Sequence, residues 1–468
     1  MAEVIYNNNQ VITPKIIKMK NNKNKTAGHD IPSYDGQKDG AATQQVQQAV
    51  RSVMQGKLLT LPDMSPTGRP IKTSSNLSAL ITFNGWDPRY NLMTGEAELA
   101  DADGERLGGS EAGQRSALVD ACQLAGVPDA VIEEHLIAIC ERHSYHPVRQ
   151  WLERGAPWDG KPRIDAVIAT LNAANPVYAS AVLHAWLVGC VAALYQPRWY
   201  SKLVPVLVGA QSYRKSAWVS RLAAVVQGST LDCAINPDKP DDVRRAVSAW
   251  VVELAELEST TRHEAGSLKA FLTRENDSYR LPYARSMTTK KRQTSYIATV
   301  NGTDFLKDTT GNARFAVIEL AAAADVESLN AVLGWSWSAG RLSQTDPEQL
   351  RQFWLEVRER YESGATWFLD DATAALAASE NDAHTDKGPY YEVIYHHHLS
   401  RPLASSEWLT ASELCARHGE RLSMASSWGK ALRLLASEGK LQSRRARSNR
   451  TEYLLPVDSP KEKGKADK

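Results

Sequence analysis

The middle of the chain alternates short, continuously apolar runs with longer stretches of helical periodicity. The apolar runs lie at 203–208, 249–254, 296–300 and 315–320, with a weaker run near 229–235. Runs without polar interruption are typical of strands that are buried on both faces. Because helical stretches separate them, the pattern predicts a parallel sheet with crossover helices and therefore an α/β fold.

Helical periodicity also flanks this segment. Apolar residues recur with helical spacing at 115–142, and the apolar run at 182–194 reads as a buried helix that is too short to span a membrane. The segment at 144–165 is rich in Trp, Pro and Gly, which indicates a packed connector with many turns. The pattern divides the chain into a disordered tail at 1–75, a helical N-terminal region at 76–180, an α/β core at 181–330, a helical region at 331–388, a small module at 389–456 and a basic tail at 457–468.

The module at 389–456 is interpreted as winged-helix-like. Thr410 and Glu413 form a capping-box pattern that starts a helix, and a second helix ends at Gly439. The following residues read as a hairpin, whose basic side chains are Arg444, Arg445, Arg447 and Arg450. In such modules the second helix enters the major groove and the hairpin contacts phosphates. The alternative is a lid or an oligomerisation module with a solvated hairpin.

The net charge bears on nucleic-acid binding only when it is counted for each region separately. The 468 residues carry a net charge of +1, which alone argues against a protein that coats nucleic acid. However, 269–292 and 440–468 each carry a net charge of +5, so the rest of the chain carries −9. A nucleic-acid partner is therefore restricted to particular regions rather than excluded. The five cysteines form no CxxC pair, which predicts neither structural zinc nor disulfides and favours the cytoplasm.

The first apolar run leads into a candidate phosphate-binding loop. A strand, a glycine, four residues and then a Lys-Ser pair that opens a helix are the layout of such loops. Loop amides and a helix N-terminus surround phosphate oxygens, while Lys215 would reach the β and γ phosphates and Ser216 would bind Mg²⁺. The loop residues are Gly209, Ala210, Gln211, Ser212, Tyr213, Arg214, Lys215 and Ser216.

The loop departs from the GxxxxGK[ST] pattern at its second glycine, which is Arg214 here. That glycine tolerates positive φ, and a residue with a side chain costs about 1–3 kcal/mol in such a conformation. The Arg214 side chain could be drawn to the phosphates or occupy their place. The alternative for the whole motif is an ordinary turn between a strand and a helix, with Arg and Lys on the surface.

The second long apolar run ends in carboxylates. A P-loop ATPase needs an acidic residue there to hold Mg²⁺, and often a second acidic residue to activate water. Glu253 and Glu256 fit these roles, and the sequence does not order them. The alternative is a solvated helix start, where acidic residues are favoured.

The next two strands are also bounded by polar residues. Asn301 follows the third run and could sense the γ-phosphate, or it could simply form a turn with Gly302. Arg314 precedes the fourth run and could act as an arginine finger in the site of a neighbouring subunit, or be an exposed arginine at a strand start. Ligands bind at the carboxyl ends of parallel strands, so the order of these residues predicts one site.

The segment at 269–292 interleaves basic and aromatic residues, which suits single-stranded nucleic acid. A charged surface helix and loop is the alternative. The candidate DNA-binding residues in this segment are Arg280, Arg285, Lys290, Lys291 and Arg292.

Taken together, these blocks resemble the virulence-associated protein E family of phages and genomic islands. The resemblance covers roughly 80–380 and rests on YHPVRQWL, WDGKPRID, VLVGAQSYRKS, WVVELAEL, LKAFLTRENDSYRLPY and TVNGTDFLKDTTGNARF. The family is similar to superfamily 3 helicases, which are AAA+-like P-loop ATPases. The resemblance therefore implies a hexameric ring that threads single-stranded DNA using ATP and Mg²⁺, with a DNA-contacting pore hairpin at 280–292.

Three residues depart from the family pattern. Ser212 and Arg214 stand where glycines are usual, and Ala313 stands where an arginine is usual. Two functions follow. The first is an ATP-dependent helicase or translocase of phage or mobile-element replication, with duplex origin DNA at its C-terminal module. The second is a degenerate relative that binds DNA or nucleotide without efficient hydrolysis and regulates or interferes with replication. A third reading is a plain P-loop ATPase without a DNA role.

Overall fold

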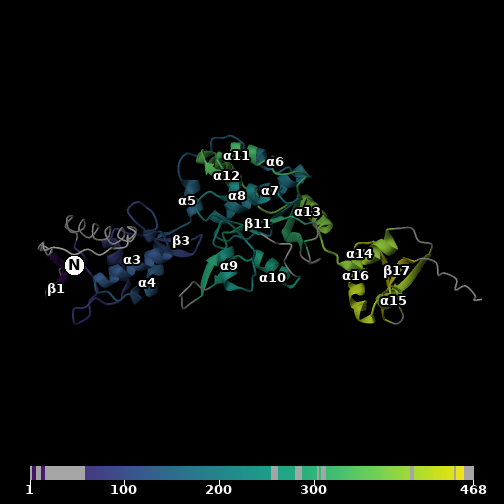
Figure 1. Ribbon diagram of the computed structural model, residues 1–468, viewed down its shortest axis with the longest axis horizontal. Helices are drawn as coiled ribbons and strands as arrows, with labels where there is room; N and C mark the ends of the chain where they lie inside the picture. The colour runs from purple at the N-terminus through teal and green to yellow at the C-terminus, as the bar shows by residue number, and fades with distance from the viewer. Residues whose placement is uncertain are drawn as a thin grey trace, which may run out of the picture.

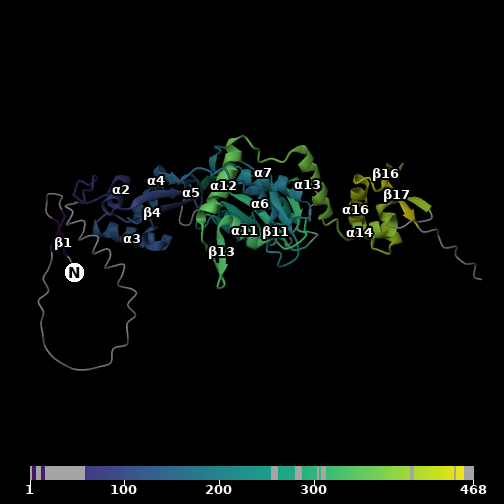
Figure 2. The same ribbon diagram turned by 90° about the horizontal axis from the view of Figure 1, so that it is seen from above.

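The computed structural model places three folded parts in a row along the long axis of the molecule (Figures 1 and 2). It describes residues 58–254, 262–279, 287–302, 305–306, 312–400, 405–446 and 449–457. It also describes the backbone of a short antiparallel pair near the N-terminus, β1 (Glu3–Tyr6) with β2 (Ile12–Lys15).

The N-terminal part is a small mixed domain. Its helices are α2 (Ser74–Phe83), α3 (Glu111–Leu124) and α4 (Ala130–Cys140), and its sheet has the order β4 (Glu96–Ala100), β3 (Asp87–Asn91), β5 (Ser144–Tyr145). Leu77, Leu99 and Leu118 are fully buried between helices and sheet. The region predicted as helical thus contains helices together with a small sheet that was not predicted. Gly126 has φ +69° and breaks the helical pattern at 115–142 into α3 and α4.

The central part is built on a five-stranded parallel sheet with the order β12-β6-β11-β8-β7. Its strands are β6 (Val204–Val208), β7 (Thr230–Cys233), β8 (Val251–Leu254), β11 (Ser295–Val300) and β12 (Phe315–Glu319). All five predicted strands, including the weaker one, are confirmed. In chain order β11 is the fourth strand of this sheet, and it lies between the first strand, β6, and the third strand, β8.

Helices cover both faces of this sheet, as Figure 1 shows. Successive residues of β6 point to opposite sides, so that Leu207 joins one hydrophobic core while Val206 and Val208 join the other. The first core includes residues of α5 (Pro147–Glu153), α6 (Ile164–Ala169), α7 (Pro176–Tyr195), α8 (Lys215–Ala223), α11 (Val326–Leu333), α12 (Pro347–Glu362) and α13 (Asp371–Ala383). The second includes residues of α9 (Pro240–Ala246) and α10 (Arg262–Leu272).

Helix α7 corrects one argument from the sequence. It runs for 20 residues, so by length and composition it could cross a membrane, although the apolar run at 182–194 alone is shorter. Most of the helix is buried in the first core, where the Trp186 indole donates to the backbone carbonyl of Tyr296 at 2.8 Å. Its apolar surface is thus explained by packing inside the protein.

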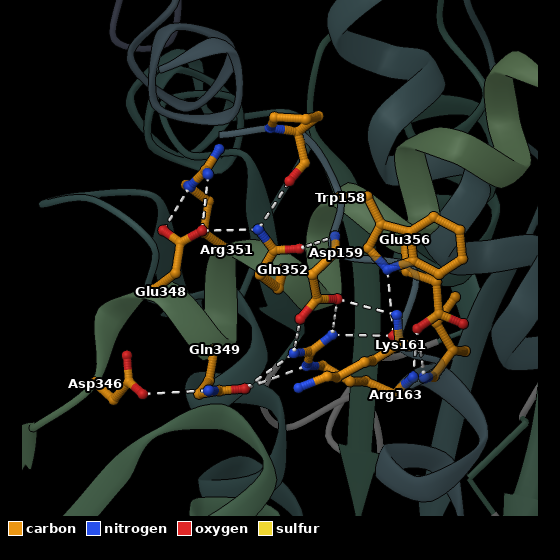
Figure 3. A network of polar contacts seen from close by, with 12 residues as sticks. Trp158, Asp159, Lys161, Arg163, Asp346, Glu348, Gln349, Arg351, Gln352 and Glu356 are labelled. Atoms are coloured by element: carbon orange, nitrogen blue, oxygen red, sulfur yellow. Dashed lines mark hydrogen bonds and ion pairs between the residues drawn. The ribbon is translucent and has the colours of Figure 1, made fainter. Parts of the chain in front are cut away.

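The connector at 144–165 is tied to α12 by a polar network, which Figure 3 shows from close by. The Arg163 guanidinium forms a bidentate pair with Asp159, both bonds at 2.8 Å, and also donates to Gln349. The Ile164 amide donates to the buried Glu356 carboxylate at 3.0 Å. The predicted packed connector is therefore confirmed.

Two hairpins project from the central part. They are β9 (Asn276–Tyr279) with β10 (Thr288–Lys291), and β13 (Trp335–Ser338) with β14 (Arg341–Gln344). The second hairpin lies in a region predicted to be helical. Trp337 and Leu342, which pair across this hairpin, are exposed, so the tryptophan content of the segment does not reflect a buried helix.

The C-terminal part is a compact module of three helices and three strands. In chain order these are α14 (Pro389–Ile394), β15 (Ser405–Thr410), α15 (Ala411–Arg417), α16 (Ala425–Ser437), β16 (Gln442–Arg445) and β17 (Thr451–Val457), and the sheet order is β15-β17-β16. The capping box of Thr410 and Glu413, the end of α16 before Gly439, and the hairpin are all confirmed. Strand β15 was not predicted.

The remaining helical turns are short: η1 (Leu107–Gly109), η2 (Glu141–His143), η4 (Asn312–Arg314), η5 (Tyr395–Leu399) and η6 (Leu422–Met424). Turn η5 carries three consecutive histidines, of which His398 is buried against the Pro456 carbonyl and His418. Among the described residues no three His, Cys, Asp or Glu side chains gather as metal ligands.

Candidate functional site

The candidate site lies at the carboxyl edge of the central sheet. The loop at 209–216 follows β6, Glu253 lies near the end of β8, and Asn301 follows β11 directly. Since β11 pairs in parallel with both β6 and β8, Asn301 emerges between the loop and the carboxylate. The predicted convergence of the loop, Glu253 and Asn301 is therefore what the sheet order produces.

Lys215 lies at the centre of this site. It is the first residue of α8, only 6% of it is exposed, and its ammonium donates to the carbonyls of Gly209 and Ala210 at 2.7 and 3.1 Å. A third bond of 3.0 Å runs to Oδ1 of Asn301. The loop thus folds back over the lysine, and the ammonium links the loop to the end of β11.

Ser216 and Glu253 form the second half of the site. The Ser216 hydroxyl donates to Glu253 Oε1 at 2.5 Å, and the Thr299 hydroxyl donates to the same oxygen at 2.6 Å. Glu253 is 5% exposed, and burial raises the pKa of its carboxyl while the two hydroxyl bonds act in the lowering direction. Thr299 was missed, although a lone polar residue in an apolar strand was a signal that could have found it.

The loop takes a glycine-like backbone without the expected glycines. Ser212 has φ +69° and Arg214 has φ +59° with ψ +25°, both in the left-handed region. The one glycine, Gly209, is required by packing, because a Cβ there would meet the Tyr213 ring at 2.8 Å and Leu320 at 3.3 Å. The positive φ predicted for position 214 is therefore present, and an arginine adopts it.

The Arg214 side chain leaves the loop toward α11. Its Nη1 donates to both carboxylate oxygens of Glu327, at 2.9 and 2.7 Å. In this conformation the guanidinium is paired with Glu327 and does not fill the loop. Glu327 was missed, because it lies 113 residues away in sequence.

Arg314 lies at the other edge of the sheet. It precedes β12, whose first residue Phe315 pairs with Val204, the first residue of β6, whereas the loop follows the last residue, Val208. The structure thus does not bring Arg314 to the loop of its own chain. Glu256, the alternative acidic residue, lies outside the described residues.

The basic segment is only partly available to a ligand. Arg280 and Arg285 lie outside the described residues, and Lys291 is exposed on β10. Arg292, by contrast, is buried in an ion pair with Asp277, where the two side chains are 1% and 0% exposed. The Lys290 ammonium donates to the carbonyls of Met93 and Val247, inside the protein. The prediction that Lys290 and Arg292 face nucleic acid is therefore wrong for this conformation.

The C-terminal hairpin keeps its basic side chains at the surface. Arg444, Arg445 and Arg450 are exposed, while Arg447 lies outside the described residues. Arg444 is held 4.1 Å above the Trp408 ring and bonded to Glu452 at 2.8 Å. Helix α16 adds an exposed face that was missed in the sequence, made up of Ser426, Lys430, Arg433 and Ser437.

Fold and site together define a mixed α/β protein with a parallel sheet and a polar site at the carboxyl edge of that sheet. Residues 152–386, half of the chain, match the virulence-associated protein E-like domain. The protein belongs to the virulence-associated protein E-like family.

Comparison with solved structures gives a distant likeness. An apo structure of the NrS-1 C-terminal region aligns with 11% identity and a TM-score of 0.42, covering 81% of this chain and 98% of that chain. An A-form apo structure of the same region aligns with 10% identity and a TM-score of 0.43, covering 81% and 99%. At this level the likeness assigns no activity. No curated protein matches the chain.

Proposed function

We propose that this protein is an ATP- and Mg²⁺-dependent DNA helicase or translocase that acts in phage or mobile-element replication in the cytoplasm of a bacterial host. The observation that carries the proposal is the convergence of Lys215, Ser216, Glu253 and Asn301 at one sheet edge. Membership of the virulence-associated protein E-like family supports the biological setting.

The residues of the loop fit a nucleoside triphosphate. Lys215 already donates to oxygens of the loop and of Asn301, so its ammonium is placed to bind phosphate oxygens between them. Arg214 has a positive φ directly before α8. A left-handed residue at this point lets successive backbone amides point toward a bound anion. In this role Lys215 binds the phosphates and Asn301 orients the group that is transferred.

Ser216 and Glu253 fit a magnesium ion, because hydroxyl and carboxylate oxygens are the ligands that Mg²⁺ prefers. Their oxygens lie 2.5 Å apart at the start of α8 and the end of β8. When bound, Mg²⁺ would neutralise charge on the phosphates. Glu253 would bind it through water, and burial, which raises the pKa of this carboxyl, also suits Glu253 to accept a proton from attacking water.

The strand order supports an AAA+-like P-loop core. With β11 between β6 and β8, a residue at the end of β11 reaches both the phosphate loop and the acidic strand. Two hydrogen bonds depend on this strand order. Lys215 donates to Asn301, and Thr299 donates to Glu253. A sensor on β11 can thus report the state of the nucleotide to two neighbouring strands.

The position of Arg314 supports a homo-oligomer, with a hexameric ring as the expected form. Arg314 lies at the sheet edge opposite the loop of its own chain, so it can act as an arginine finger only in the site of another subunit. Each subunit would then complete its neighbour's site, as in closed cyclic assemblies.

DNA is the proposed second partner. Strand order β15-β17-β16 with α15 and α16 supports a winged-helix-like module, in which the exposed face of α16 meets duplex DNA and Arg445 and Arg450 of the hairpin meet phosphates. Of the candidate basic residues in the 269–292 segment, the exposed Lys291 on β10 is the described one left for a single strand in the pore.

A forked DNA with two single-stranded tails tests the proposal without assuming a polarity. Wild-type protein with ATP and Mg²⁺ is expected to separate the strands, and Lys215→Ala is expected to bind the fork without separating it. Strand separation by Lys215→Ala at the wild-type rate would overturn the proposal, since Lys215 would then have no role in energy conversion.

A degenerate relative that binds DNA or nucleotide without efficient hydrolysis, and so regulates or interferes with replication, is the second candidate. The observation that favours it is the pair of left-handed residues, Ser212 and Arg214, in place of loop glycines. A wild-type protein that binds the fork tightly, binds ATP and yet separates no strands would establish this second function.

A further inference from the structure

We propose that Glu327 is a positioning residue of the nucleotide site, which holds the Arg214 guanidinium outside the phosphate loop and thereby weakens the grip of the loop on ATP. This inference rests on the proposed nucleotide site at 209–216. The contact with Glu327 explains why an arginine next to the proposed phosphate position does not occupy that position itself.

The backbone sets the starting point of the Arg214 side chain. Arg214 is the cap of α8, directly before Lys215, with φ +59°, and its side chain extends to Glu327 of α11. Any side chain at this position begins next to the place proposed for the phosphates, one residue before Lys215. Where the guanidinium goes from there depends on the charges within its reach.

Among the described residues, Glu327 of α11 is the acidic residue that hydrogen-bonds Arg214, while the charge of Asp325, the cap of α11, acts on Arg214 from farther away. Both carboxylate oxygens of Glu327 accept from the same Nη1, and Glu327 lies in the first turn of α11. Asp325 caps that turn by accepting from the Ser328 amide at 3.0 Å. The carboxylate therefore belongs to an ordered helix start rather than to a free side chain on a loop.

The position of α11 is in turn tied to the loop and to α8. The Ala324 amide donates to the Tyr213 carbonyl at 3.0 Å, one residue before Arg214. Further along, Arg221 of α8 donates to Asn330 of α11 at 2.7 Å. Glu327 thus keeps a fixed distance from the loop, so the pair with Arg214 does not depend on a distant movement.

The ion pair between Arg214 and Glu327 is exposed enough for the guanidinium to leave Glu327 and bind another anion. The Arg214 and Glu327 side chains are 49% and 75% exposed, so water screens their attraction. Guanidinium groups bind phosphate oxygens at least as well as carboxylates, often with two parallel bonds. A guanidinium released from Glu327 is therefore expected to turn to the phosphates bound one residue away.

The test measures the affinity for a non-hydrolysable ATP analogue with Mg²⁺ by titration calorimetry on the full chain. For Glu327→Gln we expect the Kd to fall about threefold to fivefold, because the gain is limited to the free energy of the exposed ion pair that no longer has to be broken. In the Arg214→Gly background the same substitution should change the Kd by less than about twofold, because no guanidinium remains to be released. An unchanged or raised Kd for Glu327→Gln would overturn the inference.

Glu362→Gln is the matched control. It removes the carboxylate of another exposed Arg–Glu pair, with Arg358 at 2.7 Å, on α12. It should leave the Kd unchanged while shifting thermal stability as little as Glu327→Gln does. If it tightened ATP binding equally, Glu327 would have no positioning role. If the wild-type chain bound no ATP, or Lys215→Ala bound it equally well, the proposed function itself would fail.

Discussion

At the scale of single residues, Glu253 combines two opposing influences. Burial raises the pKa of its carboxyl, and donation from the Ser216 and Thr299 hydroxyls stabilises the charged form. The sequence predicted the loop, Glu253 and Asn301, because each lies at or just after the end of a strand whose apolar run is plain in the sequence. It could not reveal Glu327, whose role depends on which helix becomes a neighbour of the loop. Thr299 stands out in the sequence as a polar residue in an apolar strand, but its partner Glu253 follows only from the strand order.

Thr299→Val tests the hydroxyl contribution. The substitution removes one donor to the ionised carboxylate at nearly constant volume, so the pKa of Glu253 should rise further. We expect the acidic limb of the pH–rate profile for ATP hydrolysis to move to higher pH, with a loss of about tenfold near that limb. Thr299→Ser keeps the hydroxyl and should retain the wild-type profile. An unmoved limb in Thr299→Val would contradict the assignment.

At the scale of elements, buried strands were predicted from the sequence, whereas half-exposed strands were missed. Four strands of the central sheet, β6, β8, β11 and β12, were predicted readily because they are buried and their sequences are almost continuously apolar. The edge strand β7 is partly exposed and includes Asp232, which is why its run was the weaker one. Strands β3, β13 and β15 were missed because they are half exposed and carry polar residues. The length of α7 was underestimated because its first turns at Pro176 are not part of the apolar run.

The β9–β10 hairpin is pinned between two parts of the protein. Lys290 donates to Met93 in the N-terminal part and to Val247 after α9, and burial lowers the pKa of its ammonium from the ordinary 10.5 to about 7. Between these two values the folded chain binds fewer protons than the unfolded chain, so the contribution of Lys290 to stability rises with pH.

Lys290→Met removes this dependence. The unfolding temperature of the wild type, relative to that of the variant, should therefore increase between pH 7 and pH 9, because only the wild-type protein has the lowered lysine pKa. Lys291→Met, which changes the exposed neighbour on β10, is the matched control and should show a constant difference. A constant difference for Lys290→Met would show that its ammonium is not buried as described.

At the scale of the whole molecule, the three parts place different chemistry along one axis (Figure 2). The proposed nucleotide site belongs to the central part, and the exposed basic groups of α16 and the β16–β17 hairpin belong to the C-terminal part. Regional charge in the sequence predicted this separation for the hairpin. It did not predict Lys430 and Arg433, because only the helix geometry brings them onto one exposed face.

The C-terminal module should bind duplex DNA mainly through phosphates. Substituting both Arg445 and Arg450 by Ala is expected to weaken binding about equally for unrelated sequences and to reduce the salt dependence by about one to two phosphate contacts. Binding is measured by fluorescence anisotropy at several salt concentrations. Arg417→Ala, whose side chain is already paired with Glu407, is the control and should leave the salt slope unchanged.

The central claim is that the loop at 209–216 supports catalysis although Ser212 and Arg214 replace glycines. Phosphate release from ATP, measured with Mg²⁺ and single-stranded DNA, tests it most directly. We predict turnover by the wild type, a loss of at least about a hundredfold in Lys215→Ala, and turnover in Arg214→Gly that stays within about threefold of wild type. A wild-type rate no higher than that of Lys215→Ala, with turnover gained in Arg214→Gly, would contradict the account.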